Sequence, residues 1–181
     1  AQATWRQADN AAAMTTHPLP ARRNATTSNP PGADSTGSRA SILAAARAEF
    51  AAHGLTGARV NTIANRAGVN KQLIYYYFGS KDDLYRSALE TVYTEIRTLE
   101  RSLNLGTLQP AAAMEALIGF SFDYLHEHPD FIALLNHENA AGAPHVRDSS
   151  AIRDTNSPLV DLIARTLARG IQAQVFRPGI D

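Results

Sequence analysis

The stretch TIANRAGVNKQLIYYYF, residues 62–78, limits the possible folds of this chain more than any other feature. Each half fits a short helix, over 60–67 and 71–77, and Gly68 lies between them. Glycine adopts left-handed backbone conformations without a side-chain clash, so Gly68 suits a tight turn. Two short helices joined in this way predict a helix-turn-helix over about 59–78.

Some residues of this stretch are expected to hold the two helices together. Ala64 is small enough for the second helix to cross closely over it, while Val69 and Ile74 pack on the first helix. These structural positions are Ile63, Ala64, Gly68, Val69, Ile74 and Phe78. The other side chains of the second helix are then partly free to face outward.

The outward side chains of the second helix are an unusual mixture, namely Lys71, Gln72, Leu73, Tyr75, Tyr76 and Tyr77. An isolated surface helix has little reason to expose aromatic and amide groups beside basic ones. A recognition helix has one, because it reaches base edges in the major groove while hydroxyls and cations hold phosphates. An alternative without a functional role stays open. In it, Tyr75, Tyr76 and Phe78 belong to the hydrophobic core, and Lys71 and Lys81 are ordinary solvent-exposed charges.

Apolar residues recur at three- and four-residue steps along the chain after residue 38, which predicts helices throughout. The expected helices beyond the motif cover 38–53, 81–103, 110–128, 130–140 and a last one that Ser157 caps and Pro158 begins. The segment 110–128 is apolar on more than one side, which is typical of a helix inside a bundle. No run alternates with period two for long enough to predict a strand, so the expected fold is all-α.

Composition divides the chain into three parts. Residues 1–37 are rich in Pro, Ala, Thr and Ser, and we expect a disordered leader. Residues 38–83 hold the predicted helix-turn-helix domain, and 84–181 a second helical domain, to which the resemblance described below assigns ligand binding and dimerisation. The whole chain has zero net charge, but 39–81 carries +5 and 82–181 carries −6. This asymmetry suggests that only the basic part meets a polyanion.

Several function classes are disfavoured by what the sequence lacks. Without cysteine there is no disulfide scaffold, thiolate metal site or cysteine nucleophile. No apolar run approaches the roughly 18 residues of a membrane span, and no signal-peptide pattern is present. No phosphate loop, nucleophile elbow or dinucleotide glycine pattern occurs. We therefore expect a cytoplasmic protein that is not an enzyme and has no cofactor.

Three linked blocks, ILAAARAEFAAHG, IANRAGVNKQLIYYYF and SKDDLY, lie in this order between Arg39 and about Tyr93. This region resembles the N-terminal domain of TetR/AcrR-family transcriptional regulators. Further on, FDYLHEHPDFIALLNHENA and GIQAQVFRPGID resemble one branch of that family's C-terminal domain. The resemblance implies a homodimeric repressor that binds a palindromic double-stranded DNA operator and is released by a small-molecule effector. Family members continue with two more helices at the dimer interface, so the chain is expected to be incomplete at its C-terminus.

The resemblance also assigns residue roles. Asn70 to Leu73 occupy the positions of the recognition helix that read bases in this family. The three tyrosines occupy positions near phosphates and bases. Lys81 corresponds to a lysine that contacts a phosphate. Arg59 stands where a Ser or Thr cap is frequent, and Leu73 where Thr or Ala is frequent, which suggests contact with a thymine methyl. Tyr77 replaces a frequent His. The predicted DNA-binding residues are Arg59, Asn70, Lys71, Gln72, Leu73, Tyr75, Tyr76, Tyr77 and Lys81.

Two further sets of residues are candidates for other roles. The first is an effector pocket lined by Phe120, Tyr124, Phe131, Leu135, Asn136 and Ile163, although core packing explains these residues equally well. The second is a zinc-type cluster for a small metal-dependent enzyme, made of His126, Glu127, His128, His137 and Glu138. Its spacing argues against a metal site, because His126 and His128 face apart on a helix. A last alternative keeps the helix-turn-helix fold as an interaction module that does not bind DNA.

Overall fold

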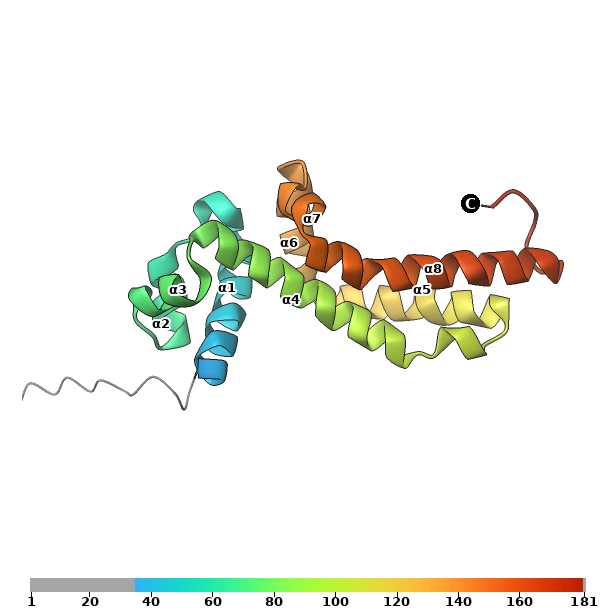
Figure 1. Ribbon diagram of the computed structural model, residues 1–181, viewed down its shortest axis with the longest axis horizontal. Coiled ribbons are helices and arrows are strands. Elements are labelled where there is room, and N and C mark those ends of the chain that lie inside the picture. The colour runs from blue at the N-terminus through green and yellow to red at the C-terminus, as the bar shows by residue number, and fades with distance from the viewer. Residues whose placement is uncertain (1–34, 181) are drawn as a thin grey trace, which may run out of the picture. The chain divides into compact units, whose positions relative to one another are not determined.

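The computed structural model describes residues 35–180, which fold into helices joined by short turns (Figure 1). In chain order these are α1 (Ser35–Gly57), α2 (Val60–Ala67), α3 (Lys71–Phe78), α4 (Lys81–Ser102), the 3-10 turn η1 (Leu105–Thr107), α5 (Pro110–Glu127), α6 (Pro129–Ala140), α7 (Pro144–Asp148) and α8 (Ser150–Gln172). Residues 35–180 contain no strand, which confirms the all-α prediction. None of the described helices has the length and apolar character needed to cross a membrane.

The predicted limits of the domains remain predictions. The expected disordered leader falls mainly on residues 1–34, which lie outside the described residues, and α1 begins at Ser35, three residues earlier than expected. The helices that follow all belong to one compact unit. The division between a DNA-binding and a ligand-binding domain near residue 83 therefore rests on the sequence.

Short-range signals fix the helix limits in the N-terminal part. The helix predicted over 38–53 is interrupted at the next residue: Gly54 has φ 65° and ψ −179°, and one further turn completes α1. Ser80 caps α4, since its hydroxyl oxygen accepts a hydrogen bond of 3.0 Å from the Asp83 N–H. Gly54 thus marks the end of the regular part of α1, and Ser80 marks the start of α4. The short helices α2 and α3 lie between these two points of the chain.

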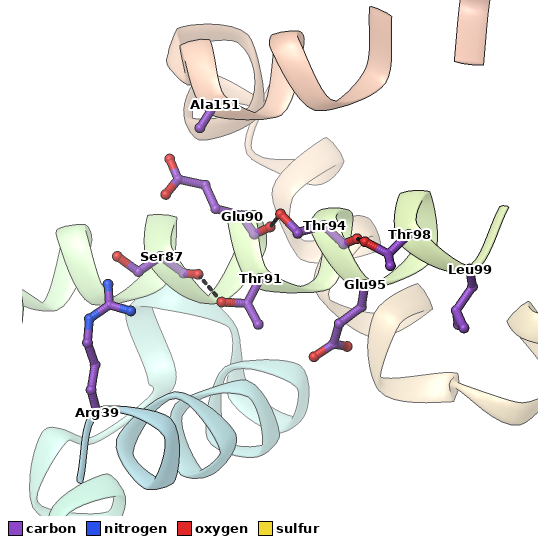
Figure 2. A pocket seen from close by; sticks show the side chains of 9 residues that line it. All are labelled: Arg39, Ser87, Glu90, Thr91, Thr94, Glu95, Thr98, Leu99 and Ala151. Carbon is purple, nitrogen blue, oxygen red and sulfur yellow. Dashed lines mark hydrogen bonds between the residues drawn. The ribbon is translucent and has the colours of Figure 1, made fainter. Parts of the chain in front are cut away.

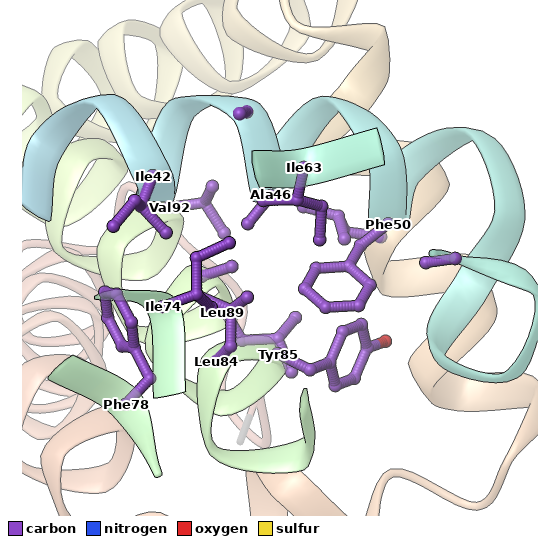
Figure 3. Close-up of a cluster of buried hydrophobic side chains, with 14 of the residues drawn as sticks. Ile42, Ala46, Phe50, Ile63, Ile74, Phe78, Leu84, Tyr85, Leu89 and Val92 are labelled. Carbon is purple, nitrogen blue, oxygen red and sulfur yellow. The ribbon is translucent and has the colours of Figure 1, made fainter. Parts of the chain in front are cut away.

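The main core lies where α1 to α4 meet (Figure 3), and buried residues of α5, α6 and α8 extend it, namely Tyr124, Phe131, Leu134 and Ile152. The residues that α1 contributes, Ile42, Ala46 and Phe50, form the apolar face expected from their spacing, and all are fully buried. Phe50 packs edge-on against Tyr85 of α4, with ring centroids 5.0 Å apart. Because α2 and α3 bury their apolar side chains in this core, it holds both short helices against α1 and α4.

A second, smaller cluster lies further along the chain and consists of Leu105, Ala113 and Leu117 with partly buried side chains of α8. Here α5 and α8 pack on each other and on η1. The helix α5 packs on α4, α6, α8 and η1, as the prediction of a helix inside a bundle requires, but it leaves Ile118 64% and Phe122 72% exposed. The helix has packing partners on one side and an apolar, open face on the other.

The predicted start of the last helix at Ser157 and Pro158 is wrong. The helix begins at Ser150, and Ser149 caps it by accepting a hydrogen bond of 3.2 Å from the Ile152 N–H. Pro158 lies inside α8, and the Ser157 hydroxyl donates to the Arg153 carbonyl (2.9 Å) instead of capping. Proline in a helix interior removes one backbone hydrogen bond, so the packing of α8 on α4 and α5 must outweigh this loss.

Candidate nucleic-acid interface

The turn between α2 and α3 has the geometry that the sequence predicts. Gly68 has φ 69° and ψ 28°, and the Val69 N–H donates to the Ala64 carbonyl at 3.0 Å. A β-carbon on Gly68 would meet no atom within 4 Å, so the left-handed backbone rather than lack of space requires glycine. The structural positions Ile63, Ala64, Ile74 and Phe78 are buried, and Val69 is partly buried. A helix-turn-helix is therefore present.

The start of α2 is held by a residue that sequence reasoning missed. The Arg59 N–H donates to Glu49 Oε1 at 3.1 Å, and Glu49 is 4% exposed. The carboxylate of α1 thus replaces the Ser or Thr cap that is frequent at position 59, and the Arg59 side chain is exposed. No local sequence pattern predicts this contact, because ten residues separate Glu49 from Arg59.

The N-terminal turn of α3 combines a cap with exposed polar side chains. Asn70 Oδ1 accepts a hydrogen bond of 2.8 Å from the Leu73 N–H, so its carbonyl oxygen is used inside the protein. Lys71 and Gln72 are exposed, and Leu73 is partly exposed. The predicted base-reading residues therefore lie at one accessible helix end.

The aromatic residues of α3 divide between solvent and core. Tyr76 is 80% exposed and Tyr75 39%, Tyr77 is partly buried, and Phe78 is 7% exposed. Lys71 Nζ lies 5.6 Å from the centroid of the Tyr75 ring. Phe78 thus belongs to the core, as the alternative interpretation allowed, while Tyr76 is the most exposed aromatic side chain of this helix.

Two cations flank α3. Lys81 is partly buried and donates from Nζ to the Thr56 carbonyl at 3.3 Å. Arg39 of α1, which sequence reasoning did not select, is exposed, and its guanidinium carbon lies 5.1 Å from the centroid of the Phe78 ring. Two basic side chains therefore lie near the C-terminal end of α3.

Ionic contacts connect this part of the molecule to α6 and α7. Arg47 of α1 donates to both carboxylate oxygens of Asp130 on α6, at 3.2 Å for the Nη2–Oδ1 pair, and forms an ion pair of 2.5 Å with Glu95 on α4. Burial acts to raise the pKa of Asp130, but the hydrogen bonds and charge of Arg47 prevail and lower it.

A second contact of this kind is centred on His145 in α7. Its Nδ1 lies 3.0 Å from Glu138 Oε2, and its Nε2 lies 3.2 Å from Asp82 Oδ2, in the first turn of α4. Glu138 is fully buried and also accepts the His145 N–H at 2.7 Å. Burial, together with the negative charge and hydrogen bond of Glu138, raises the pKa of Tyr85.

The predicted effector-pocket residues are not brought together around one cavity. Tyr124 and Phe131 are buried and pack edge-on at 5.6 Å, with Phe120 5.8 Å from Tyr124. Asn136 is exposed, and Leu135 packs against the main core. Ile163 packs instead against the second cluster. Core packing accounts for most of this set.

A hollow of about 570 Å³ lies elsewhere, along α4 between α1 and the start of α8 (Figure 2). Its lining residues are Arg39, Ser87, Glu90, Thr91, Thr94, Glu95, Thr98, Leu99 and Ala151. The hydroxyls of Thr91, Thr94 and Thr98 donate to carbonyls one turn earlier in α4, at 2.7–2.8 Å (Figure 2). Because most of this lining is exposed, the hollow is an open groove.

The residues of the zinc-type alternative have other partners. His128 stacks on Tyr124, with ring centroids 4.0 Å apart, and His137 Nε2 lies 3.2 Å from the Ala51 carbonyl. His126 and Glu127 are exposed. Among residues 35–180 no group of three or more His, Asp or Glu side chains is placed to hold a metal ion. The alternative of a metal-dependent enzyme therefore has no assembled site here.

The helix-turn-helix, the exposed end of α3 and the long helix that follows define the architecture of a helical DNA-binding regulator. Residues 42–88 match the family described as bacterial regulatory proteins, tetR family, and residues 110–181 match the tetracyclin repressor-like C-terminal domain. The chain belongs to the TetR family of transcriptional regulators.

Individual relatives agree with this assignment. The HTH-type transcriptional repressor NicS of Pseudomonas putida is 36% identical over 142 residues, which are 78% of this chain and 67% of NicS. The repressor SCO4008 of Streptomyces coelicolor is 36% identical over 67% of this chain and 66% of its own length. The solved structure of the ketosteroid transcriptional regulator KstR2 of Mycobacterium tuberculosis is 27% identical, with a TM-score of 0.61 over 79% of this chain and 72% of that one. The chain thus spans about two thirds of the length of its curated relatives.

Proposed function

We propose that this protein is a ligand-responsive repressor that binds a palindromic operator as a homodimer. The observation that carries the proposal is the division of α3: Ile74 and Phe78 fix it in the core, while Lys71, Gln72 and Tyr76 face solvent. This division leaves one helix face for the major groove. The proposal places the protein in the cytoplasm, beside the chromosome, and assigns it no catalytic role.

The roles proposed for individual residues follow from this orientation. Lys71, Gln72 and Leu73 lie at the helix end that reaches base edges, and the three tyrosines continue the surface toward the phosphates. Asn70 keeps both N–H donors of its side-chain NH₂ for DNA, while its Oδ1 caps α3. Arg59 is available for a phosphate, whereas Lys81 has to leave the Thr56 carbonyl to reach one.

Dimerisation is supported by apolar side chains that lack cover within residues 35–180. Ile118 and Phe122 on α5 and Val160 on α8 are 62–72% exposed. Exposed apolar surface is typical of protein–protein contacts. A dimer presents two recognition helices to half-sites about 34 Å apart, one turn of DNA, so a small change in their separation weakens binding.

The effector is proposed to act through α4. This helix begins directly after the recognition helix and continues into contact with α5 and α8. A ligand bound among these helices would tilt α4 and so move α3 within the dimer.

The test is DNA binding, measured by fluorescence anisotropy with a duplex from the region beside the protein's own gene. We expect Lys71→Ala and Tyr76→Ala to weaken binding, and Lys71→Ala to reduce the slope of log K against log salt by about 1. Arg165→Ala, which removes an exposed cation of α8, serves as the matched control and should leave binding unchanged. Wild-type affinity in both α3 variants would contradict the proposal.

A further inference from the structure

The imidazole of His145 in α7 lies between two carboxylates from different helices. Its Nδ1 lies 3.0 Å from Glu138 Oε2 on α6, and its Nε2 lies 3.2 Å from Asp82 Oδ2 on α4. The side chains of Glu138 and His145 are 2% and 11% exposed, whereas that of Asp82 is 55% exposed. The ring therefore joins a buried acid to one at the surface.

The number of protons on this ring decides how many of the two contacts are hydrogen bonds. A carboxylate only accepts, and a neutral imidazole has one N–H to donate, whereas an imidazolium has two. In either neutral tautomer, one ring nitrogen of His145 would turn its lone pair toward a carboxylate oxygen. Only the protonated ring donates to Glu138 and Asp82 together. Histidine side chains in general gain or lose this proton near neutral pH.

The charges around α7 make this proton important. The helices α4, α6 and α8 pack on α7. Their charged or titratable side chains beside His145 or beside its helix are Asp82, Tyr85 and Arg86 of α4, Glu138 of α6 and Arg153 of α8. Arg86 lies 3.6 Å from Asp82, and Arg153 donates to the Arg147 carbonyl. Within residues 35–180, the ion-pair partner of Glu138 is His145. Because a buried carboxylate needs a paired cation, Glu138 depends on this ring for its counter-charge.

The Asp82 end of the bridge lies next to the recognition helix. The helix α3 ends at Phe78, and the Ser80 N–H donates to the Phe78 carbonyl at 3.0 Å. Asp82 follows in the first turn of α4. The contact between His145 and Asp82 is thus a direct link from the C-terminal helices to the point where α3 joins α4.

We propose that His145 is a positioning residue for DNA binding, whose proton joins α7 to the first turn of α4 and whose deprotonation releases this turn and lowers operator affinity. The direction follows from preorganisation, since a fixed start of α4 leaves α3 fewer orientations to lose when it binds DNA. The inference rests on the proposed function, because it names a regulation of the same DNA-binding surface.

The test is DNA binding of the full chain at pH 6 and pH 8, measured by fluorescence anisotropy with the duplex from beside the protein's own gene. Wild-type protein is compared with His145→Gln, whose side chain can donate but never gains a charge. We expect the variant to bind about fivefold more weakly than wild type at pH 6 and within about twofold of it at pH 8. The same ratio at both pH values contradicts the proposal. His126→Gln, at an exposed histidine of α5, is the matched control and should bind like wild type at both.

Two neighbouring acids provide a second test, which decides the matter alone if His145→Gln does not fold. Asp82→Asn removes the charge that His145 contacts, whereas Asp83→Asn removes the same charge one residue further, where the partners are Ser80 and Arg86. The loss of affinity between pH 6 and pH 8 should be about fivefold smaller in Asp82→Asn than in wild type and unchanged in Asp83→Asn. An equal change in both variants overturns the role of His145.

A measurement without DNA distinguishes failure of this inference from failure of the proposed function. In an NMR titration between pH 6 and pH 8, the Asp83 amide should shift with the same midpoint as the His145 ring, and Asp82→Asn should abolish this shift. A protein with the shared midpoint but no DNA binding retains the link and loses the repressor assignment. A protein that binds DNA, but whose Asp83 amide does not follow His145, retains the repressor assignment and loses the link.

Discussion

The N-terminal helices and the α5–α8 part of this molecule are stabilised in different ways. In the former, side chains from four helices are fully buried together, and the helix limits follow from residues such as Gly68 and Ser80. In the latter, Tyr124, Phe131 and Ile152 join the main core, but the separate apolar cluster is small and Phe122 is exposed. A well-packed group of helices that positions α3 is thus joined to a helical bundle with exposed apolar surface. The comparison leads to four predictions.

The largest expected effect comes from emptying the main core. Phe50→Ala removes a fully buried ring that packs on Tyr85 and should reduce the free energy of unfolding by ~3–5 kcal/mol. Leu117→Ala, in the smaller cluster, should reduce it by ~2–3 kcal/mol. Urea unfolding measures both, and Val175→Ala, at a 53% exposed side chain, should stay within ~0.5 kcal/mol. A larger loss for Leu117→Ala would reverse the comparison.

Two glycine substitutions should change the free energy of unfolding in opposite directions. Gly68→Ala forces a side chain into φ 69° and should destabilise the protein by ~1–2 kcal/mol. Gly119→Ala, inside α5 with no atom within 4 Å of the new β-carbon, should stabilise it by ~0.5–1 kcal/mol. Thermal melting checks both. Stabilisation by Gly68→Ala would show that the turn does not hold this backbone conformation in solution.

The cap of α3 should contribute less. Asn70→Ala removes the acceptor for the Leu73 N–H and should reduce stability by ~1 kcal/mol. Asn65→Ala, an exposed position within α2, is the matched control and should change stability by less than ~0.5 kcal/mol. Hydrogen exchange at the Leu73 amide provides a local measurement, and unchanged protection in Asn70→Ala would exclude the cap.

The smallest expected effect is the response to acid, and it differs in sign between two carboxylates. The pKa of Asp130 is lower in the folded than in the unfolded protein. Its contribution to the free energy of unfolding is therefore present above the unfolded-state pKa of about 3.9, and it is lost as pH falls through the pKa of the folded protein. Burial raises the pKa of Glu100 in the folded protein, so its contribution is present below about 4.3 and is lost as pH rises through the folded value.

The two amide variants test this difference. Asp130→Asn should remove stability at pH 7 more than at pH 3, by less than ~1 kcal/mol because the pair with Arg47 is partly exposed. In Glu100→Gln, the free energy of unfolding should fall less than in the wild-type protein as pH rises above about 4. Unfolding free energies at several pH values provide the measurement, and the same sign of change in both variants would contradict the assignment.

Residues with a local role could be predicted from the sequence. Gly68, Asn70 and Ser80 act on a backbone within five residues, so their turn and cap positions are visible in the sequence itself. Ser157 and Pro158 carry an equally good local signal that is wrong, because the Ser149 cap and the packing of α8 outweigh it. Local signals therefore fix a helix limit only where tertiary packing does not oppose them.

Contacts across the molecule could not be predicted. Glu49 meets the Arg59 N–H, and His145 lies between Asp82 and Glu138, only because distant helices pack together. The sequence predicted which face of α3 is open, but the scattered positions of the effector-pocket candidates depend on how α5, α6 and α8 pack. An apolar residue in a bundle has the same pattern whether it lines a pocket or fills a core.

Arg47 limits the order in which this protein can change during evolution. It lies between Glu95 and Asp130, so either acid can be replaced while the other keeps its partner. Replacing the arginine first would leave two carboxylates from different helices facing each other without a counter-charge. Descendants of this protein should therefore lose an acid before they lose the arginine.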